Sequence, residues 1–599
     1  MKRLLLSTVI ALLAAPAGLL AQNTVVVTSN VTANTTWTRT NTYLLDTKIY
    51  VASGATLTIE PGTVIKGRPK ANPVDATALV VARGGRIDAQ GTATNPIIFT
   101  AESDLLTGNL TQNDRGLWGG VVILGRARIN TTSGQGNIEG IPTTEPLGTY
   151  GGTDDDDNSG VFRYVQIRHC GAIVAPNVEL NGLTMGAVGR GTTIEYVDVY
   201  ACNDDGYEWF GGTVNTKYLI SSFNDDDNFD WDEGFRGKGQ FWFGIGSATV
   251  GNQAMEMDGG TTPEDGLPYA IPEVYNITLI GSGATSTNTL SQGLIFRDNS
   301  GGKIYNAIIH DYRNYATRME TESAQSQDSA KRLAAGDLVV ANSIFGTFGA
   351  GTAATALFTA PNATAGGPAP ASNYTIEHIT GAAQANRINT DPLLTGISRT
   401  RNKGLDPRPA AGSPALTGAR TPPSDGFFNS TNYIGAFSAG NWARGWSAIS
   451  QLGYLTDADA ANPDQPVVSG SATKIYAMAN RLTLAANTIV FGGFTLDGTQ
   501  PKTVLIRAVG PGLAGVGVPT GFLADPVLRL FQGTNEIASN DDWSGQQIVD
   551  LTRTAGSFPL TAGSRDAVLV RTLAPGGYTV QITGKGASGE VIFEVYEIK

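Results

Sequence analysis

NDDGYEWFGG, residues 203–212, is followed 22 positions later by a near-copy, DDDNFDWDEG, residues 225–234. The same offset sets Trp209 against Trp231. A third version, QAMEMDGG, occupies residues 253–260, at an offset of 26 from the second. An acidic and aromatic strand that recurs at such short intervals is typical of a solenoid, in which each coil of the chain stacks on the previous one.

The repeated acidic positions predict a cation site. Neighbouring coils of a parallel β-helix lie about 4.8 Å apart, so the two offsets place Glu208, Asp230 and Glu256 in one column. Like charges on adjacent strands repel each other, and the column therefore requires a cation, or water at a wet surface. We expect Ca2+ as the cofactor, and the candidate metal ligands are Asp204, Asp205, Glu208, Asp226, Asp227, Asp230, Asp232, Glu256 and Asp258.

Weaker repeats extend the same register toward the N-terminus. Segments that begin at Tyr50 and Val80 match at an offset of 30, and ILGRARIN matches at an offset of 42, which sets Ile87 on Ile129. Unequal offsets indicate a constant cross-section with loops of varying length, whereas a β-propeller needs four strands and a steadier repeat of about 40 residues. The sequence therefore predicts an all-β chain with a right-handed parallel β-helix over residues 22–440.

The two cysteines fit this register. An offset of 32 sets Tyr164 on Tyr196 and also Cys170 on Cys202. Strands that are adjacent and in register bring their Cα atoms within disulfide range, and an exported protein meets an oxidising compartment. A disulfide and a pair of buried thiols are both consistent with this spacing.

Composition and charge narrow the class of protein. The chain has 599 residues with 75 glycines and 28 prolines, only 16% charged residues and a net charge of -12. Such a chain is turn-rich and acidic, which disfavours nucleic acid and anionic membranes as partners and suits a protein that holds divalent cations. We expect a monomer that binds a polysaccharide or a cell-surface component.

Residues 1–21 have the features of a secretory signal peptide. Lys2 and Arg3 precede an apolar run, and Ala21 is a suitable small residue before a cleavage site. A membrane anchor is the alternative, but the run is short and contains a proline and a glycine. No later stretch is long and apolar enough to span a bilayer, so we expect a secreted, extracellular protein that is released or retained at the outer cell surface.

The C-terminal part is predicted to contain a cap, a linker and a second domain. Because the end of a β-helix exposes its core, we assign residues 441–471 as cap and linker, with Trp442 and Trp446 covering the open end. Residues 472–599 contain short strands at regular spacing between Gly, Asn and Pro turns, which is typical of a β-sandwich or jelly roll of about eight strands.

Several segments resemble known families. TLTIEPGTVIKG (56–67), DDGYEWFGGTVN (204–215) and LDPRPAAGSPAL (405–416) are similar to parallel β-helix proteins exported by Gram-negative bacteria, most of which are surface or secreted proteins without a characterised function. KTVLIRAVGPGL (502–513) and LAPGGYTVQITG (573–584) resemble accessory β-sandwiches of secreted bacterial proteins, including the pre-peptidase C-terminal type. The resemblance implies an accessory domain beside a main module.

Two functions fit these observations. The first is a calcium-stabilised β-helix that binds glycans or cell surfaces in an adhesive or structural role. The second is a calcium-dependent polysaccharide lyase acting on acidic glycans, with Arg236, Lys238 or Arg297 as the base. A glycoside hydrolase would need a pair of carboxylates several ångströms apart, and the cluster offers many pairs. Because the sequence defines no catalytic set, we favour binding over catalysis.

The remaining reactive and aromatic residues have ordinary alternatives. His169, His310 and His378 are far apart in sequence and form no metal-binding or catalytic motif. Trp209 and Trp231 coincide in register, which favours a stack in the core over a platform for sugars; the run from Phe241 to Phe243 is consistent with either. The aspartate run at residues 154–157 is expected to be a solvated loop, with calcium binding as the alternative.

Overall fold

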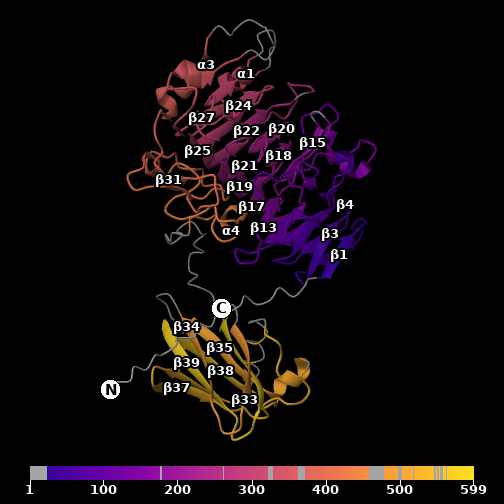
Figure 1. The fold of residues 1–599 in the computed structure, drawn as a ribbon, viewed down its shortest axis with the longest axis vertical. Coiled ribbons are helices and arrows are strands. Elements are labelled where there is room, and N and C mark those ends of the chain that lie inside the picture. Colours follow the sequence, from indigo (N-terminus) through magenta and orange to yellow (C-terminus); the bar gives the residue numbers. More distant parts are fainter. Residues whose placement is uncertain are drawn as a thin grey trace, which may run out of the picture. The chain divides into compact units, whose positions relative to one another are not determined.

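Parallel pairing between the strands of successive coils builds the larger part of the protein (Figure 1). The computed structural model describes residues 23–175, 178–260, 262–321, 328–361, 372–456, 478–496, 502–516, 518–544, 548, 552, 557–561 and 563–598. It divides into two compact units, Met1–Gln465 and Pro466–Lys599. The expected signal peptide, residues 1–21, lies outside the described residues.

Each coil of the larger unit contributes strands to three faces. The first face begins with β2 (Thr35–Trp37), β5 (Thr56–Ile59) and β8 (Arg86–Gln90). The second face begins with β1 (Asn23–Val27), β3 (Asn41–Leu45), β6 (Val64–Gly67) and β9 (Ile97–Ala101). Farther along, one long strand per coil serves both faces, because β13 pairs first with β8 and then with β9. These long strands are β13 (Gly160–Arg168), β17 (Thr193–Tyr200), β19 (Asn215–Ser222), β21 (Lys238–Ile245), β23 (Glu273–Ile280) and β25 (Gly302–His310).

A left-handed backbone residue turns each long strand from the first face to the second. Non-glycine residues rarely adopt positive φ, yet this corner is occupied in successive coils by Tyr164, Tyr196, Tyr218, Phe241, Asn276 and Asn306, with φ between 49° and 60°. The side chains at this corner point away from the core. Tyr196 stacks on Tyr218 with ring centroids 4.2 Å apart, and Phe241 continues the stack at 4.9 Å.

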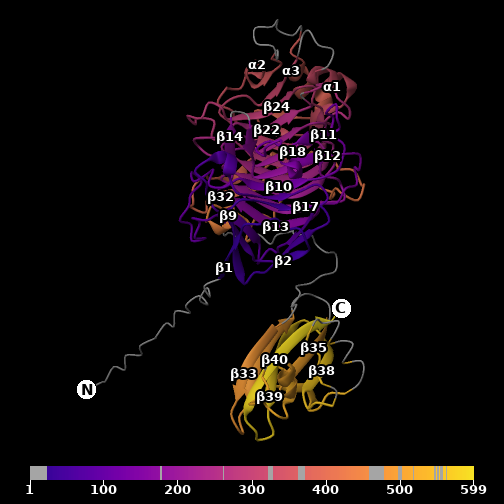
Figure 2. The ribbon, with the colours of Figure 1, turned by 90° about the vertical axis from the view of Figure 1, so that its right-hand side faces the viewer.

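The third face is a ten-stranded parallel sheet. Its strands, in order, are β4 (Lys48–Val51), β7 (Ala78–Val81), β10 (Gly120–Leu124), β16 (Leu183–Gly186), β18 (Tyr207–Phe210), β20 (Phe229–Asp232), β22 (Gln253–Asp258), β24 (Gln292–Arg297), β26 (Thr317–Met319) and β29 (Phe358–Thr359). Figure 2 shows β10, β18, β22 and β24 stacked in succession. Glu208 pairs with Asp230, and Asp230 pairs with Glu256. The predicted register of the acidic column is therefore confirmed.

One predicted pairing is wrong. The offset of 30 is confirmed by Val51 with Val81, and the offset of 42 holds on the third face, where Val81 pairs with Ile123. Ile87, however, pairs with Gly160 and not with Ile129. After β10 the chain leaves the solenoid in a long insertion, so the next first-face strand does not occur until β13.

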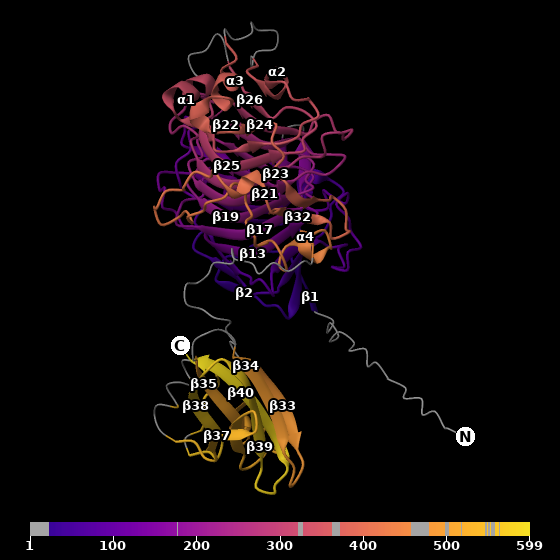
Figure 3. The ribbon, with the colours of Figure 1, turned by 90° about the vertical axis from the view of Figure 1, so that its left-hand side faces the viewer.

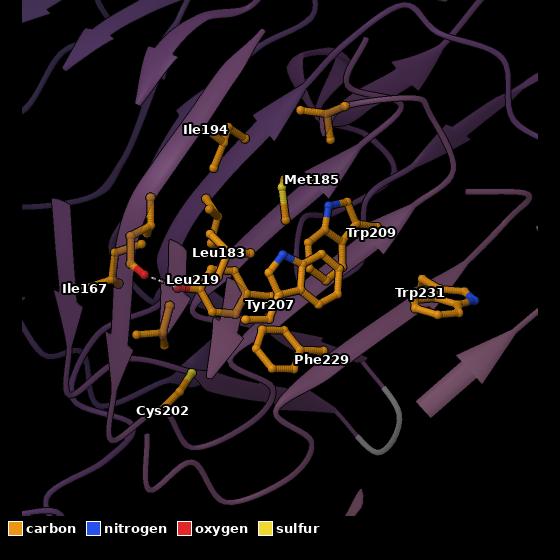
Figure 4. Close-up of a cluster of buried hydrophobic side chains, with 14 of the residues drawn as sticks. Ile167, Leu183, Met185, Ile194, Cys202, Tyr207, Trp209, Leu219, Phe229 and Trp231 are labelled. Carbon is orange, nitrogen blue, oxygen red and sulfur yellow. Dashed lines mark hydrogen bonds between the residues drawn. The ribbon is translucent and has the colours of Figure 1, made fainter. Parts of the chain in front are cut away.

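The core is a stack of apolar side chains between the three faces, and Figure 4 shows its central part. Trp209 and Trp231 are both fully buried there, as predicted. The run from Phe241 to Phe243 is divided between two environments. Trp242 points inward and stacks on Trp209 at 5.0 Å, whereas Phe241 and Phe243 pack on the outside. Cys170 and Cys202 are buried free thiols in the same core.

The predicted aromatic cap is not at the end of the β-helix. Residues 405–455, which we call the strap, run along the outside of the long strands and include β32 (Leu405–Pro409) and α4 (Ala448–Gln451). In Figures 1 and 3 this segment lies beside β17, β19 and β21. Trp442 packs edge-on against Tyr218, and Trp446 packs against Tyr196. The strap tryptophans thus cover the outward aromatic stack.

Short helices lie at the C-terminal end of the β-helix instead. Figure 2 shows α1 (Ser329–Ala335), α2 (Ala354–Leu357) and α3 (Tyr374–Ile379) at that end, and Figure 1 shows α1 and α3 there. Leu357, Phe358 and Ile379 from this region join the solenoid core. These helices therefore provide apolar cover that the strap does not.

The smaller unit is a β-sandwich of two four-stranded antiparallel sheets. One sheet has the order β33 (Met478–Leu484), β40 (Gly589–Ile598), β35 (Lys502–Val509) and β38 (Ala567–Leu573). The other has the order β34 (Val490–Leu496), β39 (Gly576–Thr583), β36 (Val527–Gln532) and β37 (Asn535–Asn540). Leu530, Val580 and Phe593 are among the side chains that form its core. The predicted fold class, a parallel β-helix followed by a small β-sandwich, is confirmed.

Candidate metal centre

The acidic column lies on the outer side of the third face. Along β18, Tyr207 and Trp209 point into the core, so the residue between them, Glu208, points outward. Asp230 and Glu256 occupy the same position on β20 and β22. Glu208 and Glu256 are nevertheless only 8% exposed. The column is therefore a set of like charges with little access to water.

The aspartates that precede each strand hold neighbouring coils together. Asp205 accepts a hydrogen bond from the backbone N–H of Asp227, 2.9 Å from its Oδ1. Asp227 in turn accepts one from the backbone N–H of Gln253, one coil farther along. Each of these carboxylates thus uses one oxygen to fix the next coil.

Seven of the nine predicted ligands come together. In each of three sets, one carboxylate oxygen per residue lies within 4.8 Å of the others: Asp204, Asp205 and Asp226; Asp205, Glu208 and Asp230; and Asp227, Asp230 and Glu256. Two predicted ligands lie outside these sets. Asp258 binds Arg297, and Asp232 accepts a hydrogen bond from the backbone N–H of Glu233.

Two oxygens in this cluster have no hydrogen-bond partner among the described residues. They are Oδ2 of Asp204 and Oδ1 of Asp230, and both atoms are buried. A buried acceptor without a donor costs about 1–3 kcal/mol, and more when it is charged. The residues present therefore fit a positively charged group bound between them, and their donor atoms are all carboxylate oxygens, which suit a hard cation such as Ca2+.

Burial and mutual repulsion both favour protonation of this cluster. Burial, followed by the charge of Asp226, raises the pKa of Asp204 to about 9. Burial and the neighbouring charges of Asp205 and Glu256 raise the pKa of Asp230 well above its usual range. Burial raises the pKa of Asp232 to about 6. A bound divalent cation would replace these protons, since its charge favours the ionised carboxylates.

Sequence reasoning missed the residues at the N-terminal end of the column. Asn181 donates a hydrogen bond to Glu208 and another, at 3.4 Å, to Glu139. Burial raises the pKa of Glu139 to about 7. Glu139 belongs to the insertion after β10, which has no counterpart in the other coils. No repeat offset connects it to the column.

Arg297 closes the column at the other end. Its guanidinium binds Asp258 through two hydrogen bonds of 2.7 Å each and also forms an ion pair with Glu256. Burial alone would lower the pKa of Arg297, but these carboxylates outweigh it and raise the pKa. Arg297 is therefore the one predicted base in contact with the cluster, and it is held in its charged form.

The other two predicted bases have different partners. Arg236 pairs with Asp155 at 3.0 Å, and Lys238 pairs with Asp425 of the strap. Asp155 also binds Arg128 at 2.7 Å. The aspartate run at residues 154–157 is only partly solvated, because Asp157 is 6% exposed. These contacts draw both bases away from the carboxylate cluster.

The three histidines contact the backbone of neighbouring coils. His310 Nδ1 accepts a hydrogen bond from Thr347 N–H, and His378 Nε2 accepts one from Val340 N–H, each at 3.1 Å. His169 Nδ1 lies 2.6 Å from the carbonyl oxygen of Asp114. Burial lowers the pKa of His378 to about 4. These contacts explain the histidines as structural residues.

Comparison with protein families shows which family the chain belongs to. A family model described as a pectate-lyase-like β-helix domain matches residues 29–390, which is more than half of the chain. The chain belongs to this family. The matched part of the pectate-lyase-like β-helix contains all nine predicted ligands and Arg297. It ends before the strap.

Two solved structures are similar to the chain at low identity. They are the enzymatically active domain of bacteriophage CBA120 tailspike protein 2 (9% identity, 92% of this chain and 72% of that chain, TM-score 0.20) and the Dettilon tailspike protein (10% identity, 94% and 88%, TM-score 0.20). A search of curated proteins found no match. In the described residues of this pectate-lyase-like β-helix protein, no helix is long and apolar enough to cross a membrane.

Proposed function

We propose that this protein is exported and that the third face of its β-helix binds glycans or cell-surface components, in an adhesive or structural role and with Ca2+ stabilising that face. The observation that carries the proposal is the crowding of seven carboxylates, two of which have a buried oxygen with no hydrogen-bond partner among the described residues. The net charge of -12 and the features of residues 1–21 support the extracellular assignment.

The electrostatic cost of the cluster supports a bound cation. Two unit charges about 4 Å apart repel by about 4 kcal/mol at an effective dielectric constant of about 20. A folded domain is stable by only about 5–15 kcal/mol, so several ionised pairs without a counter-ion would remove most of that margin. Protons or a cation must therefore be bound. Outside a cell, where calcium modules work with dissociation constants of about 0.1–1 mM, Ca2+ is the cation that the carboxylate oxygens fit.

Thermal unfolding with CaCl2 and with a chelator tests the cation. Saturation at 100 times the dissociation constant stabilises the folded state by about 2.7 kcal/mol, so we expect a higher unfolding temperature with Ca2+. Asp156→Asn is the control, since Asp156 has a side chain that is 78% exposed and pairs with Arg190 outside the cluster. An unfolding temperature that does not respond to Ca2+ or chelator would exclude a stabilising ion.

The binding function needs its own measurement. We expect the purified protein to bind a subset of glycans on an array and to lose that binding when a chelator removes the cation. Asp230→Asn should weaken glycan binding in the same way as the chelator, whereas Asp156→Asn should retain it. Uniform failure to bind glycans and intact bacterial cells would contradict the adhesive role while leaving the cation centre open to the thermal test.

A calcium-dependent lyase is the second candidate, favoured by membership of the pectate-lyase-like family. In such chemistry a bound Ca2+ acidifies the proton next to a uronate carboxyl group, and a base then removes that proton. Arg297 contacts the carboxylates, but its two bonds to Asp258 keep it protonated and unsuited to that role. The test is to incubate the protein with a panel of acidic polysaccharides and to monitor the absorbance of the unsaturated uronates that a lyase forms. No increase in absorbance on any substrate would exclude the lyase.

A further inference from the structure

The three carboxylate sets share residues, and this sharing limits which of them can hold a cation at the same time. Asp204, Asp205 and Asp226 form the first set, and Asp227, Asp230 and Glu256 form another that shares no residue with it. We call these set A and set B, respectively. The third set takes Asp205 from set A and Asp230 from set B, and adds Glu208. It therefore lies between the two sets as a bridge.

We infer that this centre holds two divalent cations, one in set A and one in set B, and that Arg297 makes the set B position the weaker of the two. The inference rests on the proposed cation centre and specifies its stoichiometry and regulation.

Each set contains one buried carboxylate oxygen that has no hydrogen-bond donor among the described residues. In set A, Asp204 is only 9% exposed and its Oδ2 has no hydrogen-bond donor in the described part of the chain. In set B, Asp230 is half-buried, but its Oδ1 atom is buried and has no donor among the described residues. One cation in set A leaves the oxygen of Asp230 unexplained, and one cation in set B leaves that of Asp204 unexplained. Two cations explain both.

The spacing of the sets permits two cations. Set B repeats the bridging set one coil farther along, because Asp205, Glu208 and Asp230 align with Asp227, Asp230 and Glu256, and coils lie about 4.8 Å apart. Set A lies at the turns that precede β18 and β20 and shares only Asp205 with the bridging set. Two-metal sites in proteins hold their ions about 3.5–4 Å apart, so a separation of one coil leaves room for two ions. Glu208, the member of the bridging set that belongs to neither set A nor set B, is only 8% exposed. The bridging carboxylates would screen the repulsion between the two ions.

Arg297 distinguishes the two positions. Its guanidinium forms an ion pair with Glu256, a member of set B. Among the described residues, no Arg or Lys pairs with Asp204, Asp205 or Asp226 of set A. A cation that enters set B must therefore compete with a guanidinium already in place, whereas no described Arg or Lys competes for set A. Within the described residues, the carboxylate cluster thus has a counter-ion beside set B and none beside set A.

Calorimetric titration of the chelator-treated full chain with CaCl2 tests this inference. We expect two equivalents that bind in separable steps. Asp204→Asn should remove the tighter step, and Arg297→Gln should strengthen the weaker step about tenfold, within the range by which groups beside a metal alter its affinity. Asp156→Asn should bind as the unmodified chain does. A single equivalent would overturn the two-cation inference and leave the proposed centre intact, whereas no binding at all would overturn both.

A direct location of the ions covers the case in which a variant does not fold. Crystals of the unmodified protein soaked with MnCl2 should give two anomalous peaks, one among the carboxylates of set A and one among those of set B. One peak, or two peaks outside these sets, would contradict the assignment.

Discussion

At the scale of single residues, alternation along a strand decides what each side chain does. On β18, Trp209 enters the core and Glu208, its neighbour, joins the carboxylate cluster. The offset of 22 predicted both assignments, because a repeated position keeps its direction from coil to coil. It could not reveal Asn181, which donates to Glu208 from outside the repeats, or Glu139, to which Asn181 also donates.

The pH dependence of stability follows from the raised pKa of Asp204, which is about 9 in the folded state against about 4 in an unfolded chain. Between these values the folded state binds more protons than the unfolded state, so stability falls as the pH rises. We expect the chelator-treated protein to unfold at a lower temperature at pH 9 than at pH 5. Its free energy of unfolding should be lower at pH 9 by roughly 1 kcal/mol or more.

Calcium should reverse this trend, because it competes with protons for the same carboxylates. The stabilisation by Ca2+ is therefore expected to grow from pH 5 to pH 9 in thermal melts. Asp204→Asn should flatten the pH profile of the chelator-treated protein. A profile that rises with pH in the absence of cations would contradict the assignment of raised carboxyl pKa values.

Trp209 supplies a test of the core. Its ring is fully buried and stacks on Trp242 at 5.0 Å. Replacing a buried Trp by Ala typically costs about 3–5 kcal/mol, and we expect a loss of that size for Trp209→Ala in denaturant unfolding. Leu267→Ala is the control, since Leu267 is 71% exposed and a surface change should cost less than about 0.5 kcal/mol.

At the scale of elements, the strap is the part that sequence reasoning placed wrongly. Its tryptophans suggested an end cap, but an aromatic residue needs only an apolar surface, and the stack from Tyr164 to Phe241 offers one on the side of the solenoid. That stack exists because the corner residues adopt positive φ and turn outward. Offsets identify which residues align but not which backbone conformation the corner takes.

Asn276 allows the attachment of the strap to be tested. It lies at the corner with φ 58°, and its side-chain amide donates hydrogen bonds to the carbonyl oxygens of Tyr433 (2.8 Å) and Gly435 (3.2 Å). Asn276→Gly keeps the favourable backbone and removes the amide, so we expect a cost of about 1–3 kcal/mol from the unpaired carbonyls. Asn276→Ala should cost about 1–2 kcal/mol more, because a β-carbon disfavours this conformation.

Limited proteolysis checks whether the loss is local. Both Asn276 variants should be cleaved faster within residues 405–455 than the unmodified protein, with Asn276→Ala the faster of the two. Equal cleavage of all three proteins would show that Asn276 does not hold the strap.

At the scale of the whole molecule, the chain carries two units with separate apolar cores. The pectate-lyase-like β-helix holds the carboxylate sets A and B. The β-sandwich has an acidic group of its own, formed by Asp525, Asp541 and Asp542. There, however, Lys585 pairs with Asp525 at 3.0 Å and with Asp541 at 2.7 Å. Lys585 is therefore a counter-ion within the sandwich. In contrast, no Arg or Lys among the described residues forms an ion pair with set A.

Differential scanning calorimetry should separate the two units. We expect two transitions, because cores that share no residues unfold independently unless a large interface couples them. Ca2+ should raise only the transition of the β-helix, which Trp209→Ala identifies by lowering the same transition. Lys585→Gln combined with Arg565→Gln should make the second transition sensitive to Ca2+, since the two changes remove the cations that pair with Asp525 and Asp541. If Ca2+ shifts the sandwich of the unmodified protein instead, the cation centre has been assigned to the wrong unit.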